Sequence, residues 1–261
     1  MKLNPLTVFG PFVPAGSGSW EQKSKIAIDA ISALPGLLGK LSFAVSSRHP
    51  GTSIDDFQIA AGLKESTKHE ASLEALFNRH MSDKSSRHDY HRIYAALFAD
   101  PGSVKRVVEI GIGSPNPRFV SSMGEKHTGA GGSLRAFRDY FPKAEIFGFD
   151  IDEDALFYED RLQTFLVDQT DSQSLEVALS RFVTDPVDLF IDDGLHSIEA
   201  NLRTLVAGLK AVRPGGWLCI EDIDPELGGL WELIASRFRD AGYRAWIVNA
   251  TNGMVFVTQR D

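Results

Sequence analysis

The chain has 261 residues, of which 43% are hydrophobic and 24% charged. This is typical of a globular protein with one large domain, or with one domain and a small appendage. Acidic residues outnumber basic ones by 35 to 27, and because nucleic-acid-binding proteins usually carry a basic surplus, we expect no nucleic-acid partner. The only cysteine, Cys219, excludes an intrachain disulfide and fits a reducing compartment. Neither a membrane-spanning apolar run nor a signal segment is evident, so we expect a cytoplasmic protein with no membrane partner.

The first part of the chain has a helical character. Apolar residues at helical spacing predict one helix over about 20–41 and another over about 70–77. We predict that residues 1–81 form a helical N-terminal extension, which contacts a substrate or a second copy of the chain. The remaining residues, 82–261, are predicted to form the main domain.

A further amphipathic helix is predicted over residues 90–97, before a turn that contains Asp100, Pro101 and Gly102. Tyr94 lies on its apolar stripe and is therefore expected in the core. Tyr90 and the nearby His88 could either reach a ligand or remain structural.

From residue 103 onward, short apolar runs rich in β-branched residues alternate with amphipathic segments. The runs predict buried strands, and the alternation predicts an α/β fold with a parallel, doubly wound sheet. Near the C-terminus, two β-rich runs flank a Thr-Asn-Gly turn, which predicts a hairpin that adds an antiparallel edge strand. The predicted strands are 105–110, 145–151, 161–168, 187–192 and 216–222, and the hairpin is 243–259.

Acidic residues stand at the carboxyl end of each predicted strand. Ligands of open α/β sheets bind beyond these ends, and carboxylates gathered there would repel one another without a cation or a donor-rich ligand. We therefore predict a functional site, although simpler roles are open: helix capping for Asp192 and Asp193, a turn for Asp150, and packing for His196. The acidic strand ends are Glu109, Asp150, Asp168, Asp192–Asp193 and Glu221–Asp222; the last pair could also be merely solvated.

The glycines after the first strand do not complete a dinucleotide-binding motif. Gly111 and Gly113 are followed by Asn116 where that motif needs a third glycine, and Pro115 interrupts the expected helix start. The pattern instead suits a cofactor without phosphate, such as S-adenosylmethionine. The backbone at Gly111 could approach such a cofactor closely, and Asp150 could accept hydrogen bonds from two ribose hydroxyls.

The pattern Glu109-x-Gly111-x-Gly113, with Asp150, Asp168 and the terminal hairpin, resembles the class I S-adenosylmethionine-dependent methyltransferases. The motif D-D-G-x-H at 192–196, together with P-G-G-x-x-x-x-E-D at 214–222, is similar to the metal-dependent deoxysugar O-methyltransferases of macrolide and calicheamicin biosynthesis. The segment DKSSRHDYHRIY extends this resemblance back to about residue 82. It implies a Rossmann-like, seven-stranded, mostly parallel sheet and Mg²⁺-dependent methyl transfer to a sugar hydroxyl of a natural product or a nucleotide sugar.

The resemblance also implies the site residues. Asp193, Glu221 and Asp222 would hold Mg²⁺, since oxygen ligands suit a hard cation, and His196 would be the general base. A sugar hydroxyl on that ion would be acidic enough for a histidine to deprotonate near neutral pH. The expected cofactor-binding residues are Tyr90, Glu109, Gly111, Ser133, Asp150, Asp168, Gln169 and Asp192.

Several points stay open at this stage. Residues 114–132 form a long connection rich in Gly, Ser and Pro, in which Met123 and His127 could line an acceptor pocket or simply be mobile. The apolar N-terminal segments and the resemblance predict a homo-oligomer. An NAD-type oxidoreductase and a non-catalytic relative that binds S-adenosylmethionine are the alternative functions. The complete set of His196 and three acidic metal ligands argues against the non-catalytic relative.

Overall fold

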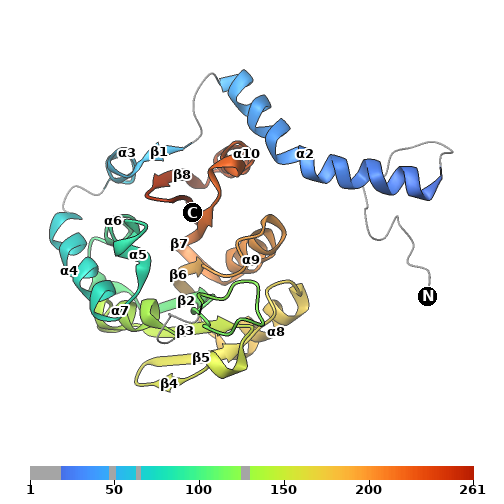
Figure 1. Cartoon of the computed structure of the whole chain (residues 1–261). Coiled ribbons are helices and arrows are strands. Elements are labelled where there is room, and N and C mark those ends of the chain that lie inside the picture. The colour runs from blue at the N-terminus through green and yellow to red at the C-terminus, as the bar shows by residue number, and fades with distance from the viewer. Residues whose placement is uncertain (1–18, 47–50, 63–65, 125–129) are drawn as a thin grey trace.

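The computed structural model describes residues 19–46, 51–62, 66–124 and 130–261. Within them lies one sheet of nine strands with helices on both faces (Figure 1). The strands are β1 (Thr52–Ser53), β2 (Arg106–Ile110), β3 (Glu145–Asp150), β4 (Tyr158–Glu159), β5 (Leu162–Leu166), β6 (Val187–Asp192), β7 (Val212–Ile223), β8 (Arg244–Ala250) and β9 (Gly253–Gln259).

The strand order is β1-β8-β9-β7-β6-β2-β3-β5-β4. The prediction of seven strands omitted β1 and β4, which have two residues each and lie at the two edges. The central strands β5, β3, β2, β6 and β7 pair in parallel, as predicted. The terminal hairpin is also present, but its antiparallel strand is not at the edge, because β9 lies between β7 and β8.

The helices are α2 (Trp20–Ser46), α3 (Ile54–Ala60), α4 (Ser66–Arg79), α5 (Asp83–Ser86), α6 (Tyr90–Leu97), α7 (Gly132–Tyr140), α8 (Ser172–Phe182), α9 (Ile198–Ala211) and α10 (Gly228–Asp240). The described residues also include three short 3₁₀ turns: η2 (Pro101–Ser103) between α6 and β2, η3 (Glu153–Ala155) between β3 and β4, and η4 (Pro225–Leu227) between β7 and α10. No described helix is long and apolar enough to span a membrane.

Two apolar layers enclose the sheet. Side chains of α3, α4, α6 and α7 cover one face, and those of α8, α9 and α10 cover the other. All six residues of β6 are buried because both of its faces are covered, which explains its continuous apolar pattern.

The N-terminal helices differ in how they are placed. Phe57, Leu73 and Phe77, from α3 and α4, are fully buried in the same core as β2 and β6. By contrast, Ala27 alone is buried among the described side chains of α2, and the N-terminal part of that helix extends away from the body (Figure 1). The division of the chain at residue 81 remains a prediction.

Candidate functional site

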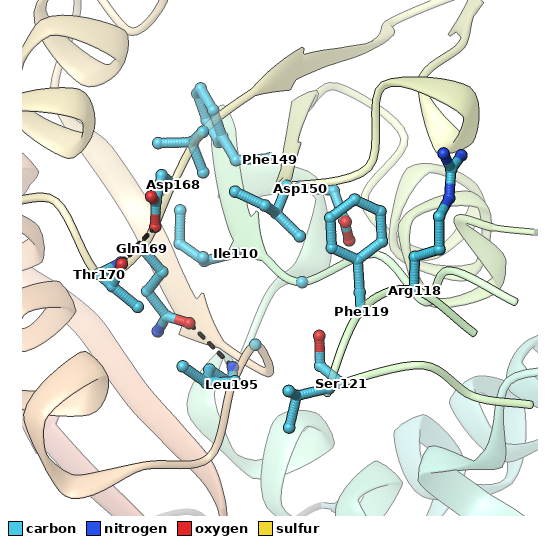
Figure 2. A pocket seen from close by; sticks show the side chains of 15 residues that line it. Ile110, Arg118, Phe119, Ser121, Phe149, Asp150, Asp168, Gln169, Thr170 and Leu195 are labelled. Carbon is cyan, nitrogen blue, oxygen red and sulfur yellow. Dashed lines mark hydrogen bonds between the residues drawn. The ribbon is translucent and has the colours of Figure 1, made fainter. Parts of the chain in front are cut away.

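A cavity of about 230 Å³ opens at the carboxyl ends of β2, β3 and β5 (Figure 2). Its floor includes Gly111 and Asp150, and the loop that holds Phe119 closes one side. Both oxygens of the Asp150 carboxylate accept backbone hydrogen bonds, from the N–H of Ile112 and of Asp152, at 2.9 Å each. Burial raises the pKa of Asp150, and these backbone donors oppose that shift. Its carboxylate therefore fixes the loop after β2 and also faces the cavity.

Gly111 must be a glycine for steric reasons. Its φ is +83°, and a Cβ there would lie 2.1 Å from the carbonyl oxygen of Asp193. The loops after β2 and β6 therefore touch at this point. Because Gly111 has no side chain, its backbone borders the cavity directly.

Asp168 and Gln169 line the same cavity, but hydrogen bonds hold both side chains within the protein. Asp168 accepts from the N–H and the hydroxyl of Thr170, at 2.8 and 2.7 Å. Gln169 donates to Asp192. It also accepts from the N–H of Leu195 (Figure 2).

A smaller cavity of about 70 Å³ continues from the first and shares Gly111 and Asp150 with it. Ser133, at the start of α7, and Met123 line this second cavity, whereas His127 lies outside the described residues. Asp193, His196 and Asp222 also line this second cavity. Five predicted cofactor residues, Gly111, Ser133, Asp150, Asp168 and Gln169, thus line one or both of these connected cavities.

The other three predicted cofactor residues, Tyr90, Glu109 and Asp192, do not line these cavities. Asp192 is fully buried and accepts hydrogen bonds from Gln169 and Asn201, at 2.7 and 3.0 Å. Glu109 accepts from the hydroxyl of Ser133 at 2.8 Å, and the Tyr90 hydroxyl donates to Asp222 at 2.6 Å. In this structure all three side chains form hydrogen bonds with neighbouring site residues: Tyr90 with Asp222, Glu109 with Ser133, and Asp192 with Gln169.

Lys84 is the residue that sequence reasoning missed. It lies in α5, it is 2% exposed, and its ammonium group contacts carboxylates from three strand ends. Its Nζ lies 2.6 Å from Asp193 and 3.2 Å from Glu109, and it also donates to Glu221. Burial would lower the pKa of Lys84, but these three charges raise it well above its usual value. Lys84 lies in the segment DKSSRHDYHRIY, which contributed to the family resemblance, but no local pattern distinguishes a buried lysine from a solvated one.

Lys84 also decides how Glu221, a predicted metal ligand, is oriented. Glu221 is 1% exposed and accepts hydrogen bonds from Lys84 and from the hydroxyl of Tyr94. Burial raises the Glu221 pKa well above its usual range. Tyr94 is buried in the core, as its place on the apolar stripe predicted.

The groups that do converge are Asp193, His196 and Asp222, which can each offer one ligand atom within 4.8 Å of the others. His196 Nε2 lies 3.6 Å from an Asp222 oxygen and 4.0 Å from an Asp193 oxygen, and all three side chains are partly exposed. His88 approaches the other Asp222 oxygen at 3.6 Å.

The backbone at this cluster is unusual. His196 and Asp222 have φ angles of +56° and +52°, a region that non-glycine residues seldom adopt. Such conformations cost free energy and persist where the surroundings impose them, often at functional sites. Helix capping does not explain Asp192 or Asp193, since the N-cap of α9 is Ser197, whose side chain accepts from the N–H of Ala200.

No family model matches the chain. The mycinamicin VI 2''-O-methyltransferase of Micromonospora griseorubida is 41% identical over 120 residues, which are 45% of this chain and 27% of that protein. A rhamnosyl tetracenomycin-C 2'-O-methyltransferase of Streptomyces olivaceus is 34% identical over 58% of this chain and 37% of its own length. The chain resembles sugar O-methyltransferases. It spans between about a quarter and two fifths of the length of these curated relatives.

A match with a solved structure identifies the fold. The MycE methyltransferase of the mycinamycin biosynthetic pathway, in complex with Mg and SAH, matches with a TM-score of 0.58 and 26% identity. This match covers 72% of the present chain and 53% of the MycE chain. The chain therefore has the Rossmann-like α/β fold of these methyltransferases, as the sequence predicted.

Proposed function

We propose that this chain is a Mg²⁺-dependent O-methyltransferase, which transfers the methyl group of S-adenosylmethionine to a sugar hydroxyl of a natural product. One observation carries the proposal: Asp193, His196 and Asp222 converge in the wall of the second of two adjoining cavities, which share Gly111 and Asp150. The named relatives are O-methyltransferases of mycinamicin VI and of a rhamnosyl tetracenomycin-C, which supports a sugar-containing small molecule as acceptor.

The larger cavity is the proposed seat of the adenosine part of the cofactor. Asp150 accepts hydrogen bonds from the ribose hydroxyls, Asp168 and Gln169 lie at the adenine end, and the apolar walls pack on the base. The smaller cavity, with Gly111 and Ser133, takes the methionine part. Tyr90, Glu109 and Asp192 are proposed to act indirectly, because they hold Asp222, Ser133 and Gln169 in place.

The donor atoms fit a hard cation. Asp193 and Asp222 are partly exposed and each offers a carboxylate oxygen to the cluster, and carboxylate oxygens are the protein ligands that Mg²⁺ prefers. Both oxygens of Glu221 accept hydrogen bonds, from Lys84 and Tyr94, so Glu221 would need a side-chain rotation to bind the ion. Lys84 also contacts one oxygen of Asp193, but the other lies 4.0 Å from His196 Nε2, so Asp193 and Asp222 are the stronger candidates. When bound, Mg²⁺ would lower the pKa of a hydroxyl on it.

His196 is the proposed general base. Its Nε2 lies beside Asp222 and borders the cavity proposed for the methionine part of the cofactor, so the nitrogen can take the proton of an acceptor hydroxyl there. Asp222 then stabilises the imidazolium that forms, and the acceptor oxygen attacks the methyl carbon in line with the departing sulfur. Tyr90 donates to Asp222 and so keeps that carboxylate oriented toward His196.

Removal of the metal tests the proposal. EDTA should abolish methyl transfer to sugar acceptors and leave the calorimetric affinity for S-adenosylhomocysteine almost unchanged, and Mg²⁺ should restore the activity. Asp150→Ala should weaken S-adenosylhomocysteine binding by roughly 1–3 kcal/mol through lost hydrogen bonds, with Asp160→Ala, at an exposed turn, as the control. Full activity in EDTA would contradict the metal, and binding of NAD without S-adenosylhomocysteine would contradict the reaction.

A further inference from the structure

A third cavity, of about 620 Å³, lies between α2 and η4. On one side α2 contributes Ser32, Ala33, Gly36, Leu37 and Lys40. Across from them lie Asp224, Glu226 and Leu227 of the η4 turn, together with His196. Its volume lies within the range of about 300–1,000 Å³ that is usual for small-molecule sites.

The three cavities form a series. The first two share Gly111 and Asp150, and the second and third share His196. A molecule in the third cavity therefore has the proposed base between itself and the proposed cofactor seat. This is the arrangement that an acceptor hydroxyl needs if a base is to deprotonate it beside a methyl donor.

The position of α2 over this cavity is fixed by a close helix crossing. A Cβ on Gly229 of α10 would lie 2.3 Å from the Cα of Gly39, so the two backbones touch where these glycines meet. Gly39 also approaches the backbone of Glu226 in η4. The wall of the cavity is thus part of the packed structure, although the rest of α2 is largely exposed.

The lining has a definite chemistry. Asp224 and Glu226 bring two carboxylates, Lys40 brings one ammonium group, and among the described residues no ion pair engages any of the three. Asp224 accepts from the N–H of Glu226 at 2.8 Å, which leaves its second oxygen free. Carboxylates accept hydrogen bonds from hydroxyl and ammonium groups, whereas they repel a pyrophosphate. Leu37 and Leu227 add an apolar surface for the C–H face of a sugar ring.

We propose that the α2–η4 cavity binds the acceptor, and that Asp224 and Glu226 select a neutral or amino-substituted glycoside over a nucleotide-diphosphate sugar. This inference rests on the proposed methyl transfer and adds the acceptor site and its charge preference. The α2 helix is thereby a specificity element of the enzyme.

The test compares variants on α2 and η4. Ser32→Trp should fill the cavity and weaken binding of a 4-nitrophenyl 6-deoxyhexoside to the Mg²⁺- and S-adenosylhomocysteine-loaded protein at least tenfold. Lys25→Trp, on an exposed part of α2 outside the cavity, is the matched control. Glu226→Lys should weaken binding of an amino-sugar glycoside and strengthen that of a thymidine-diphosphate 6-deoxyhexose, whereas Asp29→Lys should do neither.

The outcomes separate the two proposals. If Ser32→Trp weakens glycoside binding but the wild type does not methylate the glycoside, the proposed reaction is contradicted and the acceptor site is supported. Turnover that Ser32→Trp leaves unchanged would contradict the acceptor site alone. If the wild-type protein binds the nucleotide sugar as tightly as the glycosides, or more tightly, the charge preference is overturned. If the wild-type protein binds none of these probes, the acceptor site and its substrate class are overturned.

Discussion

Lys84 places a buried positive charge among three carboxylates that belong to β2, β7 and the loop after β6. Lys84→Met should lower the free energy of unfolding by about 3–5 kcal/mol, because it leaves buried charges without their partner. Urea denaturation measures this change. Lys210→Met, which breaks an exposed pair with Glu176, should cost no more than about 1 kcal/mol.

A second variant shows whether the charge of Lys84 is responsible. Adding Glu221→Gln to Lys84→Met removes one of the stranded carboxylates and should recover part of the lost stability. Equal stability of the wild type and Lys84→Met would contradict the role given to this ammonium group.

His196 is predicted to act through its imidazole. His196→Asn suits the φ of +56° better than alanine does, since asparagine tolerates the left-handed region. Turnover should fall by about 10²–10⁴-fold, the usual contribution of a positioned base, and the residual rate should rise with pH as hydroxide replaces the base. Calorimetry with Mg²⁺ provides the control. If His196→Asn also abolishes Mg²⁺ binding, His196 is a ligand of the Asp193–Asp222 cluster and not the base.

His91, on α6, gives a prediction about pH and stability. Burial lowers its pKa below 6.5, although nearby acidic residues oppose the shift. The folded state therefore favours the neutral ring, so its contribution to stability is present above about pH 6.5 and is lost as the pH falls below that value. The urea midpoint of the wild type should decline between pH 7.5 and 5.5 by more than that of His91→Gln. If the urea midpoints of the wild type and His91→Gln decline equally, His91 is not the source of the pH dependence.

Between elements, the crossing of α2 and α10 offers a direct test. Gly229→Val should push α2 away from α10, because its Cβ would meet the Cα of Gly39. Trypsin should then cleave α2 faster at its lysines, while S-adenosylhomocysteine still binds. Gly36→Ala, whose added Cβ meets nothing within 4 Å, should not accelerate cleavage. Unchanged cleavage of Gly229→Val would show that the crossing does not hold α2.

The elements themselves show what the sequence could predict. Four of the five parallel strands, β2, β3, β6 and the second half of β7, are largely buried and followed from their apolar runs, because strands covered on both faces must be apolar throughout. In β5, by contrast, only Leu162 is buried, so its prediction rested on the alternation of strands and helices. The hairpin followed from its turn, but the insertion of β9 between β7 and β8 depends on sheet pairing that no local pattern encodes. In the site, the strand-end positions predicted Asp193, Glu221 and Asp222 as one set, whereas the structure brings Asp193 and Asp222 together with His196 and leaves Glu221 outside that cluster. The orientation of Glu221 was missed because it depends on Lys84, a residue 137 positions away.

For the whole molecule, the prediction of a homo-oligomer rests on α2, whose described side chains include seven large, exposed apolar ones: Trp20, Ile26, Ile28, Ile31, Leu34, Leu37 and Leu41. Exposed apolar patches of this kind usually mark contact surfaces. Sedimentation at micromolar concentration should give a multiple of 28.7 kDa, and Ile28→Lys should shift the protein toward the monomer. A single 28.7 kDa species in the wild type would contradict the prediction.

The contacts of Lys84 also bear on the order in which the molecule is synthesised. Its partners Asp193 and Glu221 lie 109 and 137 positions further along the chain. During translation, at roughly 5–20 residues per second, Lys84 leaves the ribosome several seconds before either acid. Until β7 emerges, Lys84 and Glu109 have to stay hydrated, because Lys84 cannot yet contact Glu221. The centre of this site can therefore lose its water only after β7 has emerged, well over a hundred residues after Lys84.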